Sequence, residues 1–261
     1  MEKTKHLIFD FDGTLADTAP EIVVVTRATI RELGLAEKTE AECRSMIGVK
    51  MEEIGPMFWP GIPGLGQLFA DTYRRIAAAT RRGMTASLFP GVSETLTALR
   101  RDGYDLAVAS SRSRVSLTDY LDHLAIRDLF VQIVGGDDVH RAKPAPDAVL
   151  RLCRDRGWEP GACLMVGDAV VDIQMGASAG ARTCAAAYGN QPRETLLTAS
   201  PTYVISAFTD LAALLADSAA EPPRLRVIAP PTPPPRIMKT LNGARKICLR
   251  ERRLFRTFAA N

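Results

Sequence analysis

Short apolar runs and longer amphipathic stretches alternate along most of this chain. Apolar runs of strand length, bounded by turn residues, stand at 5–9, 105–109, 130–134, 163–166, 182–186 and 202–205. Helical spacing of apolar residues covers about 114–124, 146–156, 171–179, 193–199 and 209–216. Strands that alternate with helices are typical of a parallel sheet whose two faces are both covered. The pattern therefore predicts an α/β fold built on a doubly wound parallel sheet.

Helical patterns dominate the stretch that follows the first apolar run. We expect a helix from Thr18 to Gly34, because a capping hydroxyl and an early proline stand at its start. Two further helices are expected over 39–54 and 66–82. The segment between them, from 55 to 66, holds three prolines and four glycines and predicts a loop.

The alternating pattern stops after Asp217. Residues 222–235 contain seven prolines, and residues 222–261 carry ten Lys or Arg and one acid, Glu251. This segment contributes +9, so the remainder carries about −6 by subtraction from the net charge of +3. We expect residues 218–261 to form a Pro-rich linker and a disordered basic tail. Nucleic acid is a partner that only this tail could bind, and it is the less favoured interpretation because charge runs are usually solvated.

The composition is typical of a soluble globular protein, with 46% apolar and 24% charged residues. No apolar run approaches the roughly 18 residues that a membrane-spanning helix needs. Charged residues in the first six positions interrupt any secretory signal. The five cysteines, at 43, 153, 163, 184 and 248, are scattered without metal-ligand spacing, as is usual for reduced thiols. We therefore expect a cytoplasmic protein.

Candidate chemistry is concentrated in the sequence FDFDGTLADT, from Phe9 to Thr18. Asp10 and Asp12 stand two residues apart, a spacing that points strand side chains to the same side. They end a strand, where open α/β sheets bind their ligands. Two adjacent carboxylates repel unless a cation or a shared proton holds them, and Mg²⁺ suits such oxygen ligands. The alternative is an ordinary capped turn after a strand.

This stretch resembles the first motif of the haloacid dehalogenase superfamily in its phosphatase form. Three later segments are similar to the other motifs of that family and follow in the expected order. They are Ser110 after LAVA, Lys143 in KPAPD, and GDAVVD from Gly167 to Asp172. Four ordered motifs are far more specific than any one of them alone.

The resemblance covers about residues 5–216 and implies a domain organisation. A Rossmann-like catalytic core would comprise residues 1–16 and 87–217. A helical cap, residues 17–86, would be inserted after the first strand and would close over the substrate, with hinges near 15–18 and 84–90.

The catalytic roles follow from the resemblance and suit the chemistry of the residue types. Asp10 is the implied nucleophile, which forms an aspartyl phosphate. Asp12 is the implied general acid and then the general base. Lys143 is implied to offset negative charge on the nucleophile and the phosphoryl group, with Arg141 as a competing cation nearby. The alternative for Lys143 is a solvated surface lysine.

The implied metal is Mg²⁺, with Asp10, Asp12 and Asp168 as its ligands. Asp12 would contribute its backbone carbonyl rather than its carboxylate. Asp172 would lie one helical turn after Asp168 and would hold the metal's waters or Lys143. For Asp168 and Asp172, the alternative is a helix N-cap.

The implied phosphate-binding loop follows the strand at 105–109. The Ser110 hydroxyl and the following backbone amides could hold phosphate oxygens. Ser111 and Arg112 stand in the same loop and are further candidates for substrate binding, beside Lys143.

Within the family, the chain is most similar to phosphoglycolate phosphatases and their close relatives. The implied function is Mg²⁺-dependent hydrolysis of a small phosphorylated metabolite. A sugar-phosphate mutase, a pyrophosphatase and a broad-range sugar phosphatase stay open. Thr14 favours hydrolysis over the mutase, and Asp12 disfavours a dehalogenase. A non-enzymatic binding module that acts through the basic tail is the alternative from another class.

The cap is expected to choose the substrate. Candidates for this role stand near Thr18, Arg44, Gly48, Lys50 and Trp59. The sequence does not indicate which of these side chains face the site.

Overall fold

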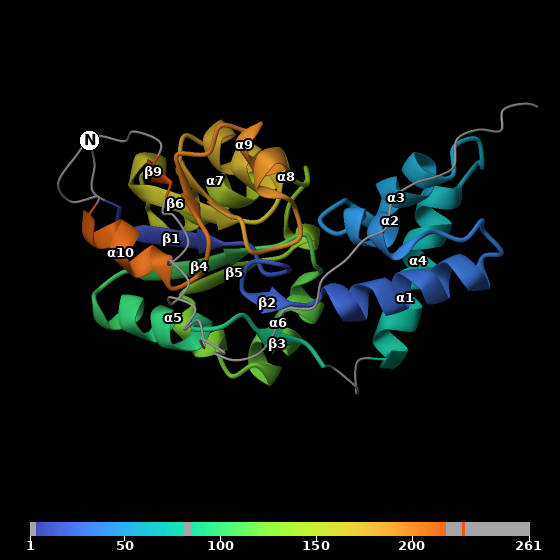
Figure 1. Ribbon diagram of the computed structural model, residues 1–261, viewed down its shortest axis with the longest axis horizontal. Coiled ribbons are helices and arrows are strands. Elements are labelled where there is room, and N and C mark those ends of the chain that lie inside the picture. The colour runs from blue at the N-terminus through green and yellow to red at the C-terminus, as the bar shows by residue number, and fades with distance from the viewer. Residues whose placement is uncertain (1–3, 81–84, 218–225, 228–261) are drawn as a thin grey trace, which may run out of the picture. The chain divides into compact units, whose positions relative to one another are not determined.

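The computed structural model describes residues 4–80, 85–217 and 226–227 (Figure 1). Seven of the described strands form a parallel sheet in the order β5-β4-β1-β6-β7-β8-β9. Their bounds are β1 His6–Phe9, β4 Asp105–Ala109, β5 Gln132–Val134, β6 Cys163–Gly167, β7 Arg182–Ala186, β8 Tyr203–Ile205 and β9 Arg226–Val227. Phe9 at the end of β1 lies in register with Val108 of β4 and Val166 of β6. The carboxyl ends of three strands therefore meet in the middle of the sheet.

Helices cover both faces of this sheet (Figure 1). The α-helices of this layer are α5 Val92–Arg101, α6 Arg114–His123, α7 Asp147–Arg156, α8 Val170–Ser178, α9 Arg193–Leu197 and α10 Asp210–Asp217. Alternate residues of β1 point to opposite faces, because Phe9 packs in one core cluster with α5, α6 and α10 while Ile8 packs with α7 and α8. The predicted α/β fold with a doubly wound parallel sheet is confirmed.

Within the described residues, short 3₁₀ helices stand in the connections at Arg127–Leu129, Gly136–Asp138 and Pro160–Ala162. The first of them shortens the strand predicted at 130–134. The Phe130 N–H donates to the Arg127 carbonyl and closes the 3₁₀ turn, so the strand starts only at Gln132. Phe130 is nevertheless buried, and its ring lies 6.4 Å from that of Phe9.

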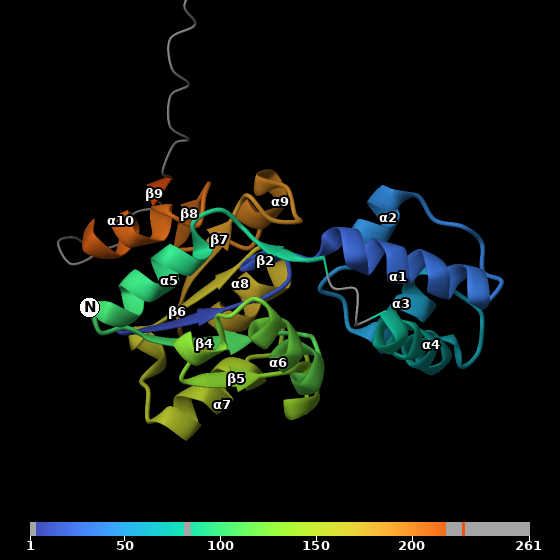
Figure 2. The ribbon, with the colours of Figure 1, turned by 90° about the horizontal axis from the view of Figure 1, so that it is seen from below.

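Two short strands, β2 Ala16–Asp17 and β3 Ser87–Leu88, pair antiparallel, and the described residues between them form four α-helices. The helices are α1 Ala19–Glu32, α2 Glu40–Ser45, α3 Met51–Phe58 and α4 Leu65–Thr80, and they gather into one group in Figure 2. They bury a hydrophobic cluster of their own. Its members are Val23, Ile30, Cys43, Met46, Ile54, Trp59, Leu65 and Phe69.

The stretch 39–54, predicted to be helical, forms α2 and the start of α3, and a non-helical segment at 46–50 separates the two helices. Gly48 has φ +87°, a left-handed conformation that interrupts the helical path. The predicted loop is also too long, since α3 continues through Pro56 and α4 begins at Leu65. A Cβ at Gly66 would meet the Glu52 carbonyl oxygen at less than 3.0 Å. This glycine therefore serves the close packing of two helices rather than a turn.

The segment predicted as linker and tail is described at two residues only. Arg226 and Val227 pair in parallel with Tyr203 and Val204, so they extend the sheet where a linker was expected. The predicted disorder of 218–225 and 228–261 lies outside the described residues.

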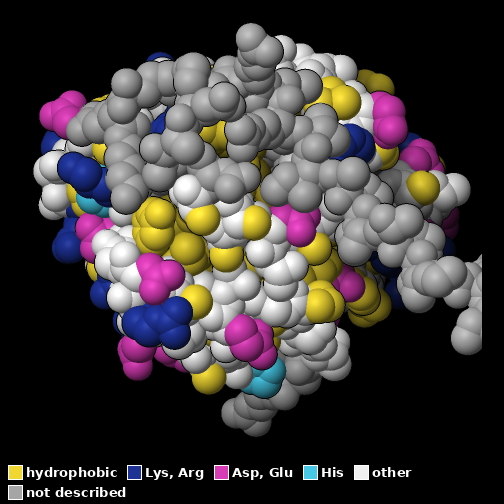
Figure 3. All heavy atoms as spheres, turned by 60° about the vertical axis from the view of Figure 1, so that its left-hand side comes forward, with side chains coloured by type: hydrophobic (Ala, Val, Ile, Leu, Met, Phe, Trp, Pro, Cys, Tyr) yellow, Lys and Arg dark blue, Asp and Glu magenta, His cyan; other side chains and the backbone are white. Residues whose placement is uncertain are grey.

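Among the described helices, none is both long and apolar enough to cross a membrane. Figure 3 shows one face of the molecule, on which acidic, basic and hydrophobic side chains of the described residues lie interspersed.

Candidate active site

The side chains of Asp10 and Lys143 meet at the carboxyl end of β1. Lys143 Nζ donates to Asp10 Oδ1 at 2.6 Å and to Asp172 Oδ1 at 2.6 Å. The Lys143 side chain is only 6% exposed, so it is not a solvated surface lysine. Its competitor Arg141 pairs instead with Asp147 and is 71% exposed.

Three buried carboxylates form a cluster next to this lysine. One oxygen from each of Asp10, Asp168 and Asp172 lies within 4.8 Å of the others. Asp168 accepts hydrogen bonds from Thr14 Oγ1 at 3.1 Å and from the Asn190 N–H at 2.7 Å. These two hydrogen bonds fix the position of the Asp168 carboxylate.

The cluster carries more negative charge than one ammonium group can offset. Burial raises the pKa of Asp10 well above its ordinary value, although Lys143 acts in the opposite direction. Burial, followed by repulsion from Asp172, raises the pKa of Asp168 to about 7. Burial would lower the pKa of Lys143, but Asp10 and Asp172 outweigh it and raise that pKa overall. Oxygen donors that share excess charge in a buried site fit a divalent cation.

The Asp12 side chain lies outside this cluster. Its Oδ1 accepts from Thr18 Oγ1 at 2.5 Å and from Arg112 Nη2 at 2.7 Å. Arg112 Nε also lies 2.8 Å from each Asp12 oxygen. The two carboxylates therefore have different cationic partners: Lys143 pairs with Asp10, and Arg112 pairs with Asp12.

The loop after β4 brings Ser110 and Arg112 to the same edge of the sheet. Ser110 is buried, and its Oγ accepts from the Arg112 N–H at 3.2 Å. Ser111 is exposed, whereas the Arg112 side chain is 15% exposed. Ser113 then caps α6, because its hydroxyl accepts from the Ser116 N–H.

A cavity of about 1060 Å³ opens above these residues. Its lining includes Asp10, Asp12, Ser110, Ser111, Arg112 and Lys143 from the α/β layer. From the helical insertion, Gly48 and Lys50 line it, as do apolar residues such as Ile22, Val25 and Ile47.

Three of the five predicted specificity candidates do not line this cavity. Trp59 is buried inside the helical insertion, where its Nε1–H donates to the Ala36 carbonyl at 3.0 Å. Arg44 pairs with Glu40 on the same helix. Thr18 is fully buried and contacts Asp12.

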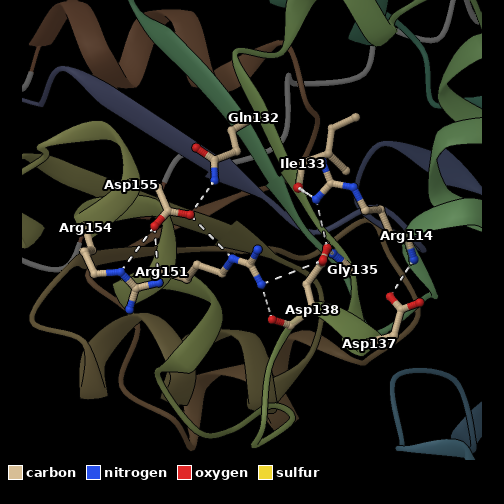
Figure 4. A network of polar contacts seen from close by, with 9 residues as sticks. All are labelled: Arg114, Gln132, Ile133, Gly135, Asp137, Asp138, Arg151, Arg154 and Asp155. Carbon is tan, nitrogen blue, oxygen red and sulfur yellow. Dashed lines mark hydrogen bonds and ion pairs between the residues drawn. The ribbon is translucent and has the colours of Figure 1, made fainter.

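A polar network braces the segment between β5 and α7, which carries Lys143 (Figure 4). Asp138 accepts from the Gly135 N–H at 2.9 Å and from Arg114 Nη1 at 3.1 Å. Arg151 of α7 lies 3.7 Å from Asp138 and 3.5 Å from Asp155. These contacts join the end of the strand to the helix that follows the lysine.

Sequence reasoning missed the groups that orient the predicted residues. Asn190 holds Asp168, and the Tyr188 hydroxyl donates to the Thr14 carbonyl at 2.8 Å. The sequence could have indicated Tyr188 and Asn190 as candidates. The run AYGN follows the apolar segment 182–186, so turn residues stand at the end of a predicted strand, where ligands bind. Tyr120 donates to Glu21 at 2.6 Å, and no local pattern links those two positions.

Residues 7–186 match the family described as haloacid dehalogenase-like hydrolase. The chain therefore belongs to this family of hydrolases, and it is a phosphatase. A phosphoglycolate phosphatase from Nitrosospira multiformis is 31% identical over 197 residues, which cover 73% of this chain and 86% of that protein. An N-acetylmuramic acid 6-phosphate phosphatase from Pseudomonas aeruginosa is 30% identical over 193 residues, covering 72% and 83%.

A solved haloacid dehalogenase-like family hydrolase from Streptococcus pneumoniae has the same fold. Its TM-score is 0.71 at 22% identity, and the match covers 81% of this chain and 98% of that one.

Proposed function

We propose that this phosphatase is Mg²⁺-dependent and hydrolyses a small phosphate monoester, with 2-phosphoglycolate as the first candidate. The observation that carries the proposal is the contact of Lys143 Nζ with Asp10 Oδ1 at 2.6 Å, beside the cluster of Asp168 and Asp172. Relatives named phosphoglycolate phosphatase support the substrate class. The relative named for N-acetylmuramic acid 6-phosphate makes a sugar phosphate the second candidate.

Two steps complete the reaction. An oxygen of Asp10 attacks phosphorus, the bond from phosphorus to the ester oxygen breaks, and protonated Asp12 donates its proton to the leaving alkoxide. In the second step Asp12 accepts a proton from water, whose oxygen attacks phosphorus and breaks the bond to Asp10. Inorganic phosphate is released and both aspartates return to their starting states.

Lys143 and the Ser110 loop hold the phosphoryl group in this scheme. The ammonium group is fixed by two carboxylates, so it offsets charge without having to reorganise. The Ser110 hydroxyl and the loop amides contact the phosphoryl oxygens. The exposed Ser111 contributes through its backbone.

The metal would be held by Asp10 and Asp168, with the Asp12 backbone carbonyl as a third ligand. Their oxygens are hard donors, which Mg²⁺ prefers, and the excess negative charge of the cluster favours a divalent cation. Bound Mg²⁺ would offset the negative charge of the transferring phosphoryl oxygens. Asp172 holds Lys143.

Residues 17–86 act as a cap that excludes water from the phosphoenzyme. The cap lines one side of the cavity with apolar side chains, and its Gly48 and Lys50 reach the same space. The paired segments Ala16–Asp17 and Ser87–Leu88 would act as the hinges of cap closure.

The test compares wild-type protein with Asp10→Asn on 2-phosphoglycolate, N-acetylmuramic acid 6-phosphate and an aryl phosphate. We expect kcat to fall by at least about 10³-fold on every ester, because an amide cannot form the phosphoenzyme. Far-UV circular dichroism checks that the variant is folded. Wild-type activity should vanish in excess chelator and return with Mg²⁺. Residual activity of Asp10→Asn above roughly 1% of wild type would refute the assigned nucleophile.

A further inference from the structure

Arg112 is a buried cation on the cavity wall whose anionic partner is the candidate general acid. Its Nε and Nη2 atoms lie 2.7–2.8 Å from the Asp12 carboxylate and engage both oxygens. Thr18 donates to the same carboxylate. While these bonds persist, Asp12 is held by the protein's own groups and is not free to contact a leaving oxygen.

Contacts other than Asp12 hold the guanidinium in place. Its Cζ lies 4.3 Å from the centre of the Tyr120 ring and 5.7 Å from that of Phe11. Arg112 Nη1 donates to Ser116 Oγ at 3.3 Å. Tyr120 is itself anchored, because its hydroxyl donates to Glu21 at 2.6 Å. The cation would therefore keep its position if Asp12 moved away.

The guanidinium also has capacity for a second ligand. It carries five N–H donors, and the described contacts account for three of them. Its backbone N–H bonds to Ser110 Oγ at 3.2 Å, which places Arg112 on the loop proposed to bind the phosphoryl group. A planar guanidinium is well suited to bidentate recognition of a carboxylate.

Other described cations lining the cavity are placed differently. Lys143 is held by Asp10 and Asp172. Arg141 is 71% exposed and pairs with Asp147. Lys50 stands at the start of α3 and is exposed. Arg74 of α4 pairs with Glu52 and is 52% exposed. Among the described cations that line the cavity, Arg112 alone is both largely buried and paired with Asp12, the carboxylate that must move to act as general acid.

We propose that Arg112 exchanges Asp12 for a second anionic group on the substrate. It thereby selects phosphate esters whose leaving group carries a carboxylate or a comparable anion. This inference rests on the proposed function and names the substrate class for the same site. The exchange itself makes and breaks only ion pairs and hydrogen bonds. The released Asp12 carboxylate takes up a proton from solvent and turns toward the ester oxygen, to which it then donates that proton. A neutral leaving group cannot replace the carboxylate charge, so Asp12 stays paired with Arg112.

The test uses 2-phosphoglycolate and its neutral amide, which differ in charge but scarcely in size. In the wild-type protein we expect kcat/KM for 2-phosphoglycolate to exceed that for the amide by about 100-fold. We expect kcat to contribute to this ratio as well as KM, because Asp12 is released only by the charged substrate. Arg112→Met should reduce the ratio to within a few-fold, and Arg112→Lys should retain part of it.

Arg101→Met is the control, because Arg101 is 77% exposed and does not line the cavity. It should keep the wild-type ratio. Lys50→Met tests the competing cation of the helical insertion. The proposal is overturned if Arg112→Met keeps the preference, or if Lys50→Met abolishes it while Arg112→Met does not.

The wild-type ratio requires no variant, so the proposal can fail even if Arg112→Met does not fold. Equal kcat/KM for the two esters in the wild-type protein would overturn it and would leave the proposed phosphatase mechanism intact. Failure to hydrolyse the aryl phosphate in the presence of Mg²⁺ would instead refute the proposed function, and this inference with it.

Discussion

At the scale of single residues, the geometry of the carboxylate cluster depends on a glycine in the first motif. Gly13 has φ +82°, a left-handed conformation that a residue with a Cβ rarely adopts. A Cβ there would also lie less than 3.0 Å from the side chains of Asp168 and Asn190. Both the conformation and the space at this position therefore require glycine.

Gly13→Ala should lower metal-dependent activity at least about 10-fold, because Asp168 must move to accept the methyl group. Gly34→Ala is the matched control, since Gly34 has φ +62° but nothing within 4 Å of its added Cβ. The control should lose only about 1 kcal/mol of unfolding free energy, from backbone strain. Steady-state kinetics over a Mg²⁺ titration and urea unfolding provide the comparison. Equal activity in the two variants would contradict the argument.

At the scale of elements, the helical insertion is stabilised by its own core. The Trp59 and Phe69 rings stack with their centres 5.8 Å apart, and both side chains are buried. The Thr39 and Glu42 side chains form a capping box that starts α2. These contacts lie within the insertion, so its folding depends on its own residues.

Phe69→Ala should cost about 3–5 kcal/mol of unfolding free energy, because it removes a fully buried ring and leaves a cavity. Leu68→Ala, one position earlier on α4, should change it by less than roughly 0.5 kcal/mol, since Leu68 is 54% exposed. Urea unfolding of both variants measures the difference. A cost for Leu68→Ala as large as that for Phe69→Ala would show that the assigned core is incorrect.

At the scale of the whole molecule, the described fold and site lie within one compact unit that runs from residue 1 to 229. All of the proposed site residues lie between Asp10 and Asp172. Strand β9 lies near the end of this unit and pairs with β8. We therefore expect the proposed chemistry not to require residues 230–261.

A chain that ends after Ala229 should have kcat and KM within about twofold of the full chain, because it retains every proposed site residue. A chain that ends after residue 220 also lacks β9, so it should unfold at a lower urea concentration while keeping its active site. Kinetics and urea unfolding on the two truncated proteins separate these effects. Loss of activity in the longer one would assign a catalytic role to residues 230–261.

The sequence by itself determined the fold class and the family, because those depend on local patterns. Apolar runs that alternate with amphipathic stretches specify strands and helices, and parallel strands bring their carboxyl ends to one edge. Residues that end such strands, including Asp10 and Asp168, therefore meet whatever the details of packing. Their catalytic roles stay predictions.

Only the tertiary structure decided how the side chains pair and which glycines turn the chain. Arg112 stands 100 residues from Asp12, and no spacing in the sequence links them. Likewise Gly66 lies where α4 packs closely against α3, although its local sequence is typical of a loop. The physical reason is the same in both cases. A side chain's partner and the space around a Cβ depend on segments that only folding brings together.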